Sequence, residues 1–175
     1  MEKLFVVKNR IAQAFRAPGI ENINLSDSIR PEKTTVYELE LGYKVSDAIF
    51  TSVNVFDVRI DDPITYFYDE LNDAEGYENQ DQSGTSGLEL ELRYQRPQLQ
   101  AVATYSYYGA RSFLVGHRPV SEAQDYYAVP GHSDSMLGLA PHKVTLNADY
   151  ELLPRLWLNL SGMFLSRRYG YTALD

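Results

Sequence analysis

Residues 86–110 read SGLELELRYQRPQLQAVATYSYYGA and contain the clearest two-residue alternation in the chain of 175 residues. Leu88, Leu90 and Leu92 fall on one side of an extended strand, and the charged residues between them fall on the other. A corner around Pro97 separates this strand from a second strand-like segment. The stretch therefore predicts two consecutive strands, of which the first has one apolar and one polar face.

Further segments of this kind lie on both sides of the stretch. In all, the sequence predicts seven strands, over about 4–15, 35–44, 49–60, 86–96, 99–110, 142–152 and 156–164. The first segment is also compatible with a short helix. Because no other helical period stands out, we expect an all-β fold, an antiparallel up-and-down meander of about seven strands.

The connections between these strands differ in length in a regular order. Short turns lie at 44–48, 96–98 and 153–155, and long links at 16–34, 61–85 and 111–141, so the two kinds strictly alternate. In a meander this puts every short turn at one end of the sheet and every long link at the other. Outer-membrane barrels have this layout. A soluble sandwich or a lipocalin-like barrel also alternates in sequence, but its loops are seldom sorted by end.

The chain contains 14 tyrosines, and several end an apolar stripe. Three predicted strands run from a long link to a short turn and carry such a tyrosine near the turn: Tyr43, Tyr94 and Tyr150. A phenol ring prefers apolar surroundings while its hydroxyl prefers water, so aromatic girdles mark the two interfaces of a membrane barrel. A second girdle, near the long links, is expected from Phe56, Tyr107 and Phe164.

Composition and motifs argue against several other classes of protein. The net charge is −8, which disfavours nucleic acid as a partner, and the absence of cysteine excludes disulfides and thiolate metal sites. The longest segment without a charge, 97–110, is shorter than the ~20 residues of a membrane-spanning helix. The N-terminus has no pattern of a signal peptide. Because no nucleophile–base constellation or phosphate loop is found, we expect no enzyme, no catalytic residue, no metal and no cofactor.

Four motifs resemble those of one family. The segment QAFRAPG at 13–19 resembles the FRAP box of TonB-dependent outer-membrane receptors. IRPEKTTVYELELGY at 29–43 is similar to that family's L-K-P-E…Y-E-L-G strand, GLELE at 87–91 to its G-x-E-x-E strand, and APHK at 140–143 to its P-x-H-K segment. The motifs follow the family's order at strand-length spacing, and the resemblance extends over nearly the whole chain.

The resemblance implies a large transport barrel of about 22 strands with a plug domain in its lumen. Such receptors take up a ferric siderophore, haem, cobalamin or a glycan across a Gram-negative outer membrane, energised through TonB. Because seven strands cannot close a bacterial membrane barrel, residues 1–175 are expected to be a piece from the C-terminal part of the barrel, without the plug domain. The alternative is a soluble or outer-membrane binding or adhesion module without transport.

The two sides of the predicted strands give two expectations. In a barrel wall, the convex, lipid-side face is expected to carry Leu39, Leu41, Leu90, Leu92, Leu146 and Leu158. A charged side chain facing lipid costs up to about 2–4 kcal/mol for Lys or Arg at the midplane. The charged residues are therefore expected on the lumen side: Glu38, Glu40, Glu89, Glu91, Arg93, Lys143 and Asp149.

The long links provide the candidate ligand contacts. The link at 61–85 has eight carboxylates and no Lys or Arg, and its spacing fits a solvated loop better than a calcium site. The link at 111–141 carries the side chains best suited to a ligand, Arg111, His117, Arg118, Tyr126, Tyr127 and His132. The alternative is a loop without a specific role. Haem-uptake members have a His and an N-P-N-L box after FRAP, and because Asn22–Leu25 lacks both features, the resemblance argues against haem.

Overall fold

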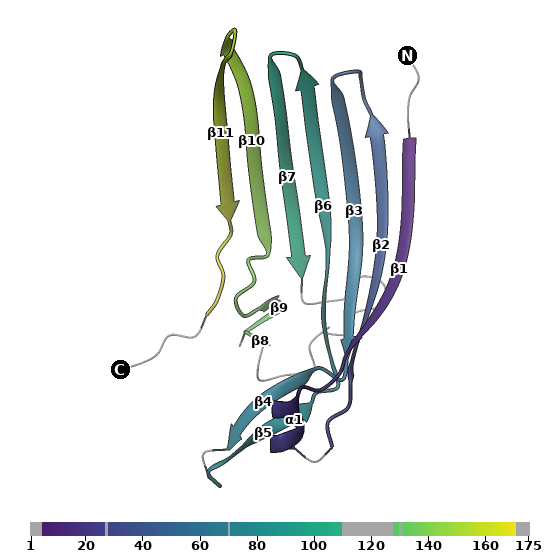
Figure 1. Cartoon of the computed structure of the whole chain (residues 1–175), viewed down its shortest axis with the longest axis vertical. Helices are drawn as coiled ribbons and strands as arrows, with labels where there is room; N and C mark the ends of the chain where they lie inside the picture. The colour runs from purple at the N-terminus through teal and green to yellow at the C-terminus, as the bar shows by residue number, and fades with distance from the viewer. Residues whose placement is uncertain (1–4, 27, 70, 110–127, 130, 171–175) are drawn as a thin grey trace, which may run out of the picture.

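The computed structural model describes residues 5–26, 28–69, 71–109, 128–129 and 131–170. Seven long antiparallel strands form one sheet in the order β1-β2-β3-β6-β7-β10-β11 (Figure 1). Their bounds are β1 Phe5–Arg16, β2 Glu32–Lys44, β3 Ile49–Asp61, β6 Gln82–Arg96, β7 Leu99–Gly109, β10 His142–Leu153 and β11 Leu156–Leu165. The predicted meander of seven strands is confirmed, and its first segment is a strand, not a helix.

The long links carry short elements that the sequence did not predict. They are α1 (Ile20–Leu25), the hairpin β4 (Ile64–Asp69) and β5 (Ala74–Asn79), and the pair β8 (Ala128–Val129) and β9 (His132–Met136). All lie at the end of the sheet opposite the short turns (Figure 1). Part of the acidic 61–85 link is thus a hairpin and not an irregular loop. No helix of the described residues is long and apolar enough to cross a membrane.

The register of the sheet separates two faces. One row of direct partners runs Leu41, Val53, Leu90, Tyr105, Val144 and Phe164, and the next row runs Glu40, Asn54, Glu89, Ser106, Lys143 and Leu165. Paired residues point to the same side of a sheet, and successive residues point to opposite sides. We call the first side the leucine face and the second the glutamate face. The six predicted leucines share the leucine face, as expected.

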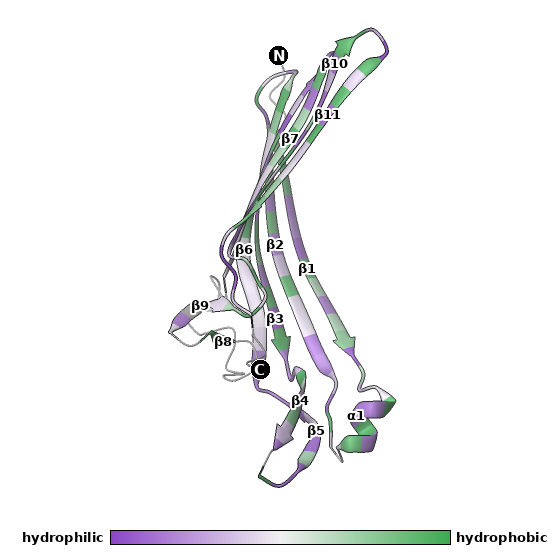
Figure 2. Cartoon of the chain, turned by 90° about the vertical axis from the view of Figure 1, so that its left-hand side faces the viewer, coloured by the Kyte–Doolittle hydropathy of each residue, from purple (hydrophilic) through white to green (hydrophobic). Residues whose placement is uncertain are grey.

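No second layer covers the leucine face in the described part of the chain (Figure 2). Leu39 is 43% exposed, Leu92 50% and Leu158 58%, and the buried apolar residues of the described chain are only Ala48, Phe56 and Val129. A soluble sandwich or closed barrel would bury these leucines, because each buried leucine contributes about 1.5–3 kcal/mol. The observed sheet is therefore an open, single layer with a large bare apolar surface.

Two glycines on the glutamate face allow aromatic rings to lie over the sheet. A β carbon at Gly42 would lie 2.8 Å from Cζ of Phe50, and one at Gly87 would lie 2.7 Å from Cζ of Phe56. Phe56 also packs against Tyr108, with ring centroids 5.7 Å apart. Phe56 is therefore on the glutamate face, and its expected place in an aromatic girdle on the opposite face is wrong.

Candidate functional site

The predicted lumen charges share the glutamate face and form ion pairs along it. Lys8 Nζ lies 3.0 Å from Glu40 Oε2, and Arg10 Nη1 lies 3.5 Å from Glu38 Oε2 on the same pair of strands. Farther along the sheet, Arg93 Nη2 lies 2.9 Å from an oxygen of its own-strand neighbour Glu91. Such exposed pairs each contribute at most about 1 kcal/mol. Their main effect is to keep the charges of this face close to balanced.

A shallow depression of about 370 Å³ lies in the middle of the glutamate face. Its polar and charged lining comes from β2, β3, β6, β7 and β10: Glu40, Ser52, Asn54, Glu89, Glu91, Thr104, Ser106, Tyr108 and Lys143. The Tyr108 hydroxyl donates to Glu89 Oε1 at 2.9 Å. Asn54 Oδ1 is buried and has no partner among the described residues. This surface is suited to polar groups, since a buried acceptor without a donor is unfavourable.

The leucine face has an uncharged centre and tyrosines along its turn end. Tyr43 on β2 lies in the same row of the sheet as Leu92 on β6, with Thr51 of β3 between them, and Tyr94 is two residues closer to the turns than Leu92. In the same way Tyr94 lies in one row with Ala148 on β10, with Ala101 of β7 between them, and Tyr150 is two residues closer to the turns than Ala148. From one tyrosine to the next, the position therefore shifts by two residues, about 6.8 Å along the strand, and by two strand spacings, about 9.6 Å across the sheet. The line through the three tyrosines is inclined by about 35° to the hydrogen bonds, which matches the strand tilt of 35–45° in membrane barrels.

The link end of the leucine face repeats this offset. Phe164 pairs through Val144 with Tyr105, and Tyr107 lies two residues farther toward the long links. Phe164 and Tyr107 therefore lie on a line of the same inclination as the tyrosines at the turn end. Two parallel lines of aromatic residues are the arrangement expected where a tilted sheet meets two interfaces.

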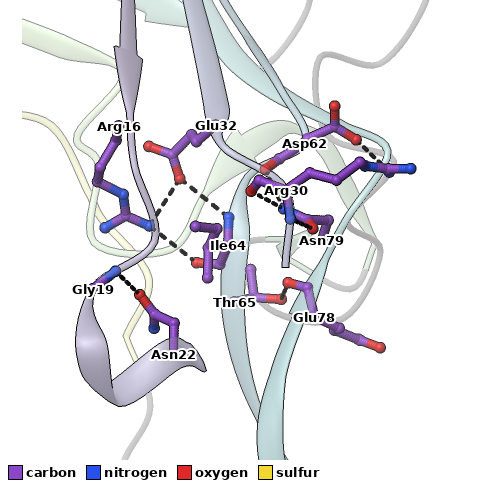
Figure 3. A network of polar contacts seen from close by, with 10 residues as sticks. All are labelled: Arg16, Gly19, Asn22, Arg30, Glu32, Asp62, Ile64, Thr65, Glu78 and Asn79. Carbon is purple, nitrogen blue, oxygen red and sulfur yellow. Dashed lines mark hydrogen bonds and ion pairs between the residues drawn. The ribbon is translucent and has the colours of Figure 1, made fainter. Parts of the chain in front are cut away.

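At the link end, α1 is docked on the hairpin β4–β5. Gly19 N donates to Asn22 Oδ1 at 2.8 Å at the start of the helix (Figure 3). At its other end, the Ser26 hydroxyl donates to Tyr77 O at 2.6 Å and accepts from Tyr77 N at 2.8 Å. A β carbon at Gly76 would lie 3.1 Å from Leu25 O, so glycine permits this close approach. Ser26 thus joins this end of the helix to the hairpin through two hydrogen bonds.

A second set of contacts joins residues 30–32, which follow the helix, to the hairpin and to the ends of β1 and β3 (Figure 3). Asn79 Oδ1 accepts from Arg30 N at 2.7 Å, while its Nδ2 donates to the carbonyls of Arg30 and Asp62 at 3.0 and 2.8 Å. The Arg30 guanidinium also pairs with Asp62 Oδ1 at 2.5 Å. Glu32 accepts from Arg16 at 2.9 Å and from Ile64 N at 3.1 Å. Together, α1 and the hairpin form one cap at this end of the sheet, which we call the link cap.

The carboxylates of the hairpin are occupied by local hydrogen bonds. The Tyr68 hydroxyl donates to Asp73 Oδ1 at 2.8 Å, and this bond raises the pKa of Tyr68. Asp69 accepts from Asn72 Nδ2 at 2.6 Å and from Leu71 N at 3.0 Å, which lowers the pKa of Asp69. Among the described residues no group of three or more His, Asp or Glu could hold a metal ion.

Most predicted ligand contacts lie outside the described residues: Arg111, His117, Arg118, Tyr126 and Tyr127. The sixth, His132, lies on β9, where its Nε2 is 3.0 Å from the Tyr169 hydroxyl and the two rings are 4.7 Å apart. Local sequence patterns do not predict this pairing or the link cap, because some of the partners are as many as 51 positions apart.

A family model described as TonB dependent receptor-like, beta-barrel matches residues 9–175. The chain belongs to the TonB-dependent receptor β-barrel family. Members of this family are outer-membrane transporters and not enzymes. The resemblance noted in the four sequence motifs is thereby confirmed.

Two solved structures have a similar fold. The siderophore receptor PirA from Acinetobacter baumannii superposes with a TM-score of 0.64 at 15% identity, over 91% of this chain and 26% of the receptor. The copper transporter OprC superposes with a TM-score of 0.56 at 19% identity, over 84% of this chain and 22% of the transporter. The chain thus spans about a quarter of each. No curated protein sequence matches it.

Proposed function

We propose that this chain is a wall segment of an outer-membrane receptor that takes up a scarce nutrient with energy from TonB. The whole receptor would comprise the remaining barrel strands and a plug domain, with the plug and ligand on the glutamate face. Seven strands are about a third of a 22-stranded barrel. The edge strands β1 and β11 are where the ladder of the full barrel would continue.

The observation that carries this proposal is the uncharged centre of the leucine face, which lies between two inclined aromatic lines. In water such a surface is an aggregation liability, whereas in lipid it needs no further cover. In the described residues the charges next to it lie on the opposite face, where a charge avoids the cost of about 2–4 kcal/mol at the bilayer midplane. The girdle at the turn end would consist of Tyr43, Tyr94 and Tyr150, and the opposite girdle would include Phe164 and Tyr107.

The nutrient is proposed only as a class: a ferric siderophore, cobalamin, a glycan or haem, of which haem is disfavoured by the Asn22–Leu25 segment. The proposed ligand contacts are those of the 111–141 link, of which His132 is described, beside Tyr169. Uptake distinguishes this proposal from a binding or adhesion module. Cells carrying the complete receptor should accumulate its nutrient when TonB is present and lose that uptake when TonB is deleted, whereas an adhesion module would bind without accumulation in both.

A pair of neighbouring tryptophan variants tests the lipid face. In a Trp157→Phe background, which removes the single native tryptophan, Leu90→Trp puts an indole on the leucine face and Glu89→Trp puts one on the glutamate face. In bilayers of brominated phosphatidylcholine, lipid bromine should quench the first indole strongly and the second weakly. Equal quenching, or no quenching of either, would contradict a lipid-facing leucine surface.

A further inference from the structure

A histidine lies between two tyrosines at the link end of the leucine face. His142 is the direct partner of Tyr107 in the sheet, and its Nδ1 lies 2.8 Å from the Tyr105 hydroxyl. The ring centroid of His142 is 6.0 Å from that of Tyr105, with the planes 23° apart, and 5.2 Å from that of Tyr107. His142 is exposed. A polar ring is therefore held in a fixed orientation at the edge of the apolar surface.

The Tyr105 hydroxyl determines which nitrogen of His142 is available. When this hydroxyl donates to Nδ1, the proton of the neutral imidazole is on Nε2. The hydrogen bond to Tyr105 uses Nδ1 and not Nε2. In that tautomer the neutral ring, like the protonated ring, carries an N–H donor on Nε2 at the level of the aromatic line.

Two arginines follow directly after β11, close to this histidine. Ser166 N donates to His142 O at 2.9 Å, and His142 N donates to Ser166 Oγ at 3.0 Å. Arg168 is two residues farther, a distance of at most about 7 Å in an extended chain, and it is exposed, as is Arg167. Arg168 lies past the end of β11 at Leu165, in the segment that leaves the sheet beside His142. Neither arginine has a carboxylate within 4.0 Å in the described part of the chain.

The link end of β10 and β11 differs in charge from the link end near β3. The link cap, beside β3, carries the carboxylates Asp69, Glu75 and Glu78 on its two hairpin strands and Asp73 in the turn between them. On the leucine face, the described side chains at the link ends of β7, β10 and β11 include His142 and no carboxylate, and Arg167 and Arg168 follow β11, whereas Lys143 points to the glutamate face. In a chain of net charge −8, the link end of β10–β11 is thus a locally cationic region that adjoins an apolar surface.

We propose that His142 and Arg168 bind the phosphate of a membrane lipid headgroup in the leaflet next to the long links. The proposal rests on the proposed function, because it needs the leucine face to contact lipid. Arginine binds phosphate in a bidentate manner, and the imidazole N–H adds a third donor. The acyl chains of the same lipid would then lie along the apolar side chains below, beginning with Phe164 and Val144.

Binding of lipid to the full chain in dodecyl maltoside micelles tests this site. The probes are phosphatidic acid, phosphatidylcholine and inorganic phosphate, with affinities measured by native mass spectrometry. Removing both donors in His142→Ala/Arg168→Ala should weaken phosphatidic acid binding by about tenfold or more, since hydrogen bonds to charged groups are among the stronger ones. Arg168→Gln alone should weaken it in part, and because Arg168 lies after the last strand this variant leaves the ladder intact.

The controls separate the site from general attraction. Arg155→Ala removes an exposed arginine at the opposite, turn end and should leave phosphatidic acid binding unchanged. Phosphatidylcholine, whose phosphate has one negative charge and is esterified to choline, should bind more weakly than phosphatidic acid. Inorganic phosphate, which has no acyl chains, should bind weakly and without dependence on His142 or Arg168. Equal phosphatidic acid affinity in all variants, or a similar site-dependent affinity for inorganic phosphate, would overturn the inference while the tryptophan test still supports a lipid-facing surface. Failure of both tryptophan variants to be quenched would instead overturn the proposed function.

Discussion

Replacing Leu90 by arginine should strongly destabilise the chain in a bilayer. Leu90 is four residues from Tyr94 on β6, which is about 13.6 Å of strand and, at an inclination of 35°, about 11 Å of depth. The apolar band of a membrane barrel is about 25 Å tall, so Leu90 would lie near the midplane. An arginine facing lipid there costs about 2–4 kcal/mol.

The matched control puts the same residue on the other face. Ser52 is the direct partner of Glu91 and lines the polar depression, so Ser52→Arg adds an arginine next to a carboxylate. Urea unfolding of the chain in phosphatidylcholine vesicles, followed by the fluorescence of Trp157, gives the free energy of unfolding of each variant. We expect a loss of about 2–4 kcal/mol for Leu90→Arg and less than about 1 kcal/mol for Ser52→Arg. Equal losses would refute the assignment of the two faces.

Three further predictions concern other parts of the fold. Gly87→Val should destabilise the sheet by about 3 kcal/mol in the same unfolding assay, because its β carbon would lie 2.0 Å from a backbone oxygen of β7; unchanged stability would contradict this. Ser26→Ala should speed amide exchange at Tyr77 N, its partner at 2.8 Å, and equal exchange rates would count against the docked helix. The pKa of Tyr68 is raised by its bond to Asp73, so this bond stabilises the fold below pH 10 and is lost as the pH rises through the raised value; phenolate absorbance should show Tyr68 ionising earlier in Asp73→Asn.

The sequence predicts the strands, and it predicts which residues face which way only in strands that have one uniformly apolar side. In β6, leucines alternate with charged residues, so the apolar side can be assigned without the partner strands. In β3, apolar residues occur on both sides, Phe56 and Val58 on one and Val53 and Val55 on the other. In β3, only the register with β2 and β6 shows which residues lie on which face. The sequence alone therefore predicts the wrong face for Phe56.

The link cap was not predictable for a related reason. The hairpin of residues 64–79 is rich in carboxylates, which are typical of solvated loops, yet its tyrosines alternate and hydrogen-bond to those carboxylates. Asp73 adopts a φ of 48° in the turn, a conformation that aspartate tolerates well. In the described part of the chain, the hydrogen bonds that dock α1 on this hairpin join Ser26 and Tyr77, which are 51 positions apart. No local pattern in the sequence indicates such a pair.

The central claim, that the leucine face contacts lipid, is tested most directly by spin labels along β6. Because the chain has no cysteine, single cysteines introduced from Leu88 to Tyr94 can each carry one nitroxide without background labelling. In phosphatidylcholine bilayers, contact with dissolved oxygen should be high at positions 88, 90 and 92 and low at 89, 91 and 93, with the opposite pattern for a water-soluble nickel reagent. Equal contact with the nickel reagent at all positions would contradict a lipid-facing leucine surface.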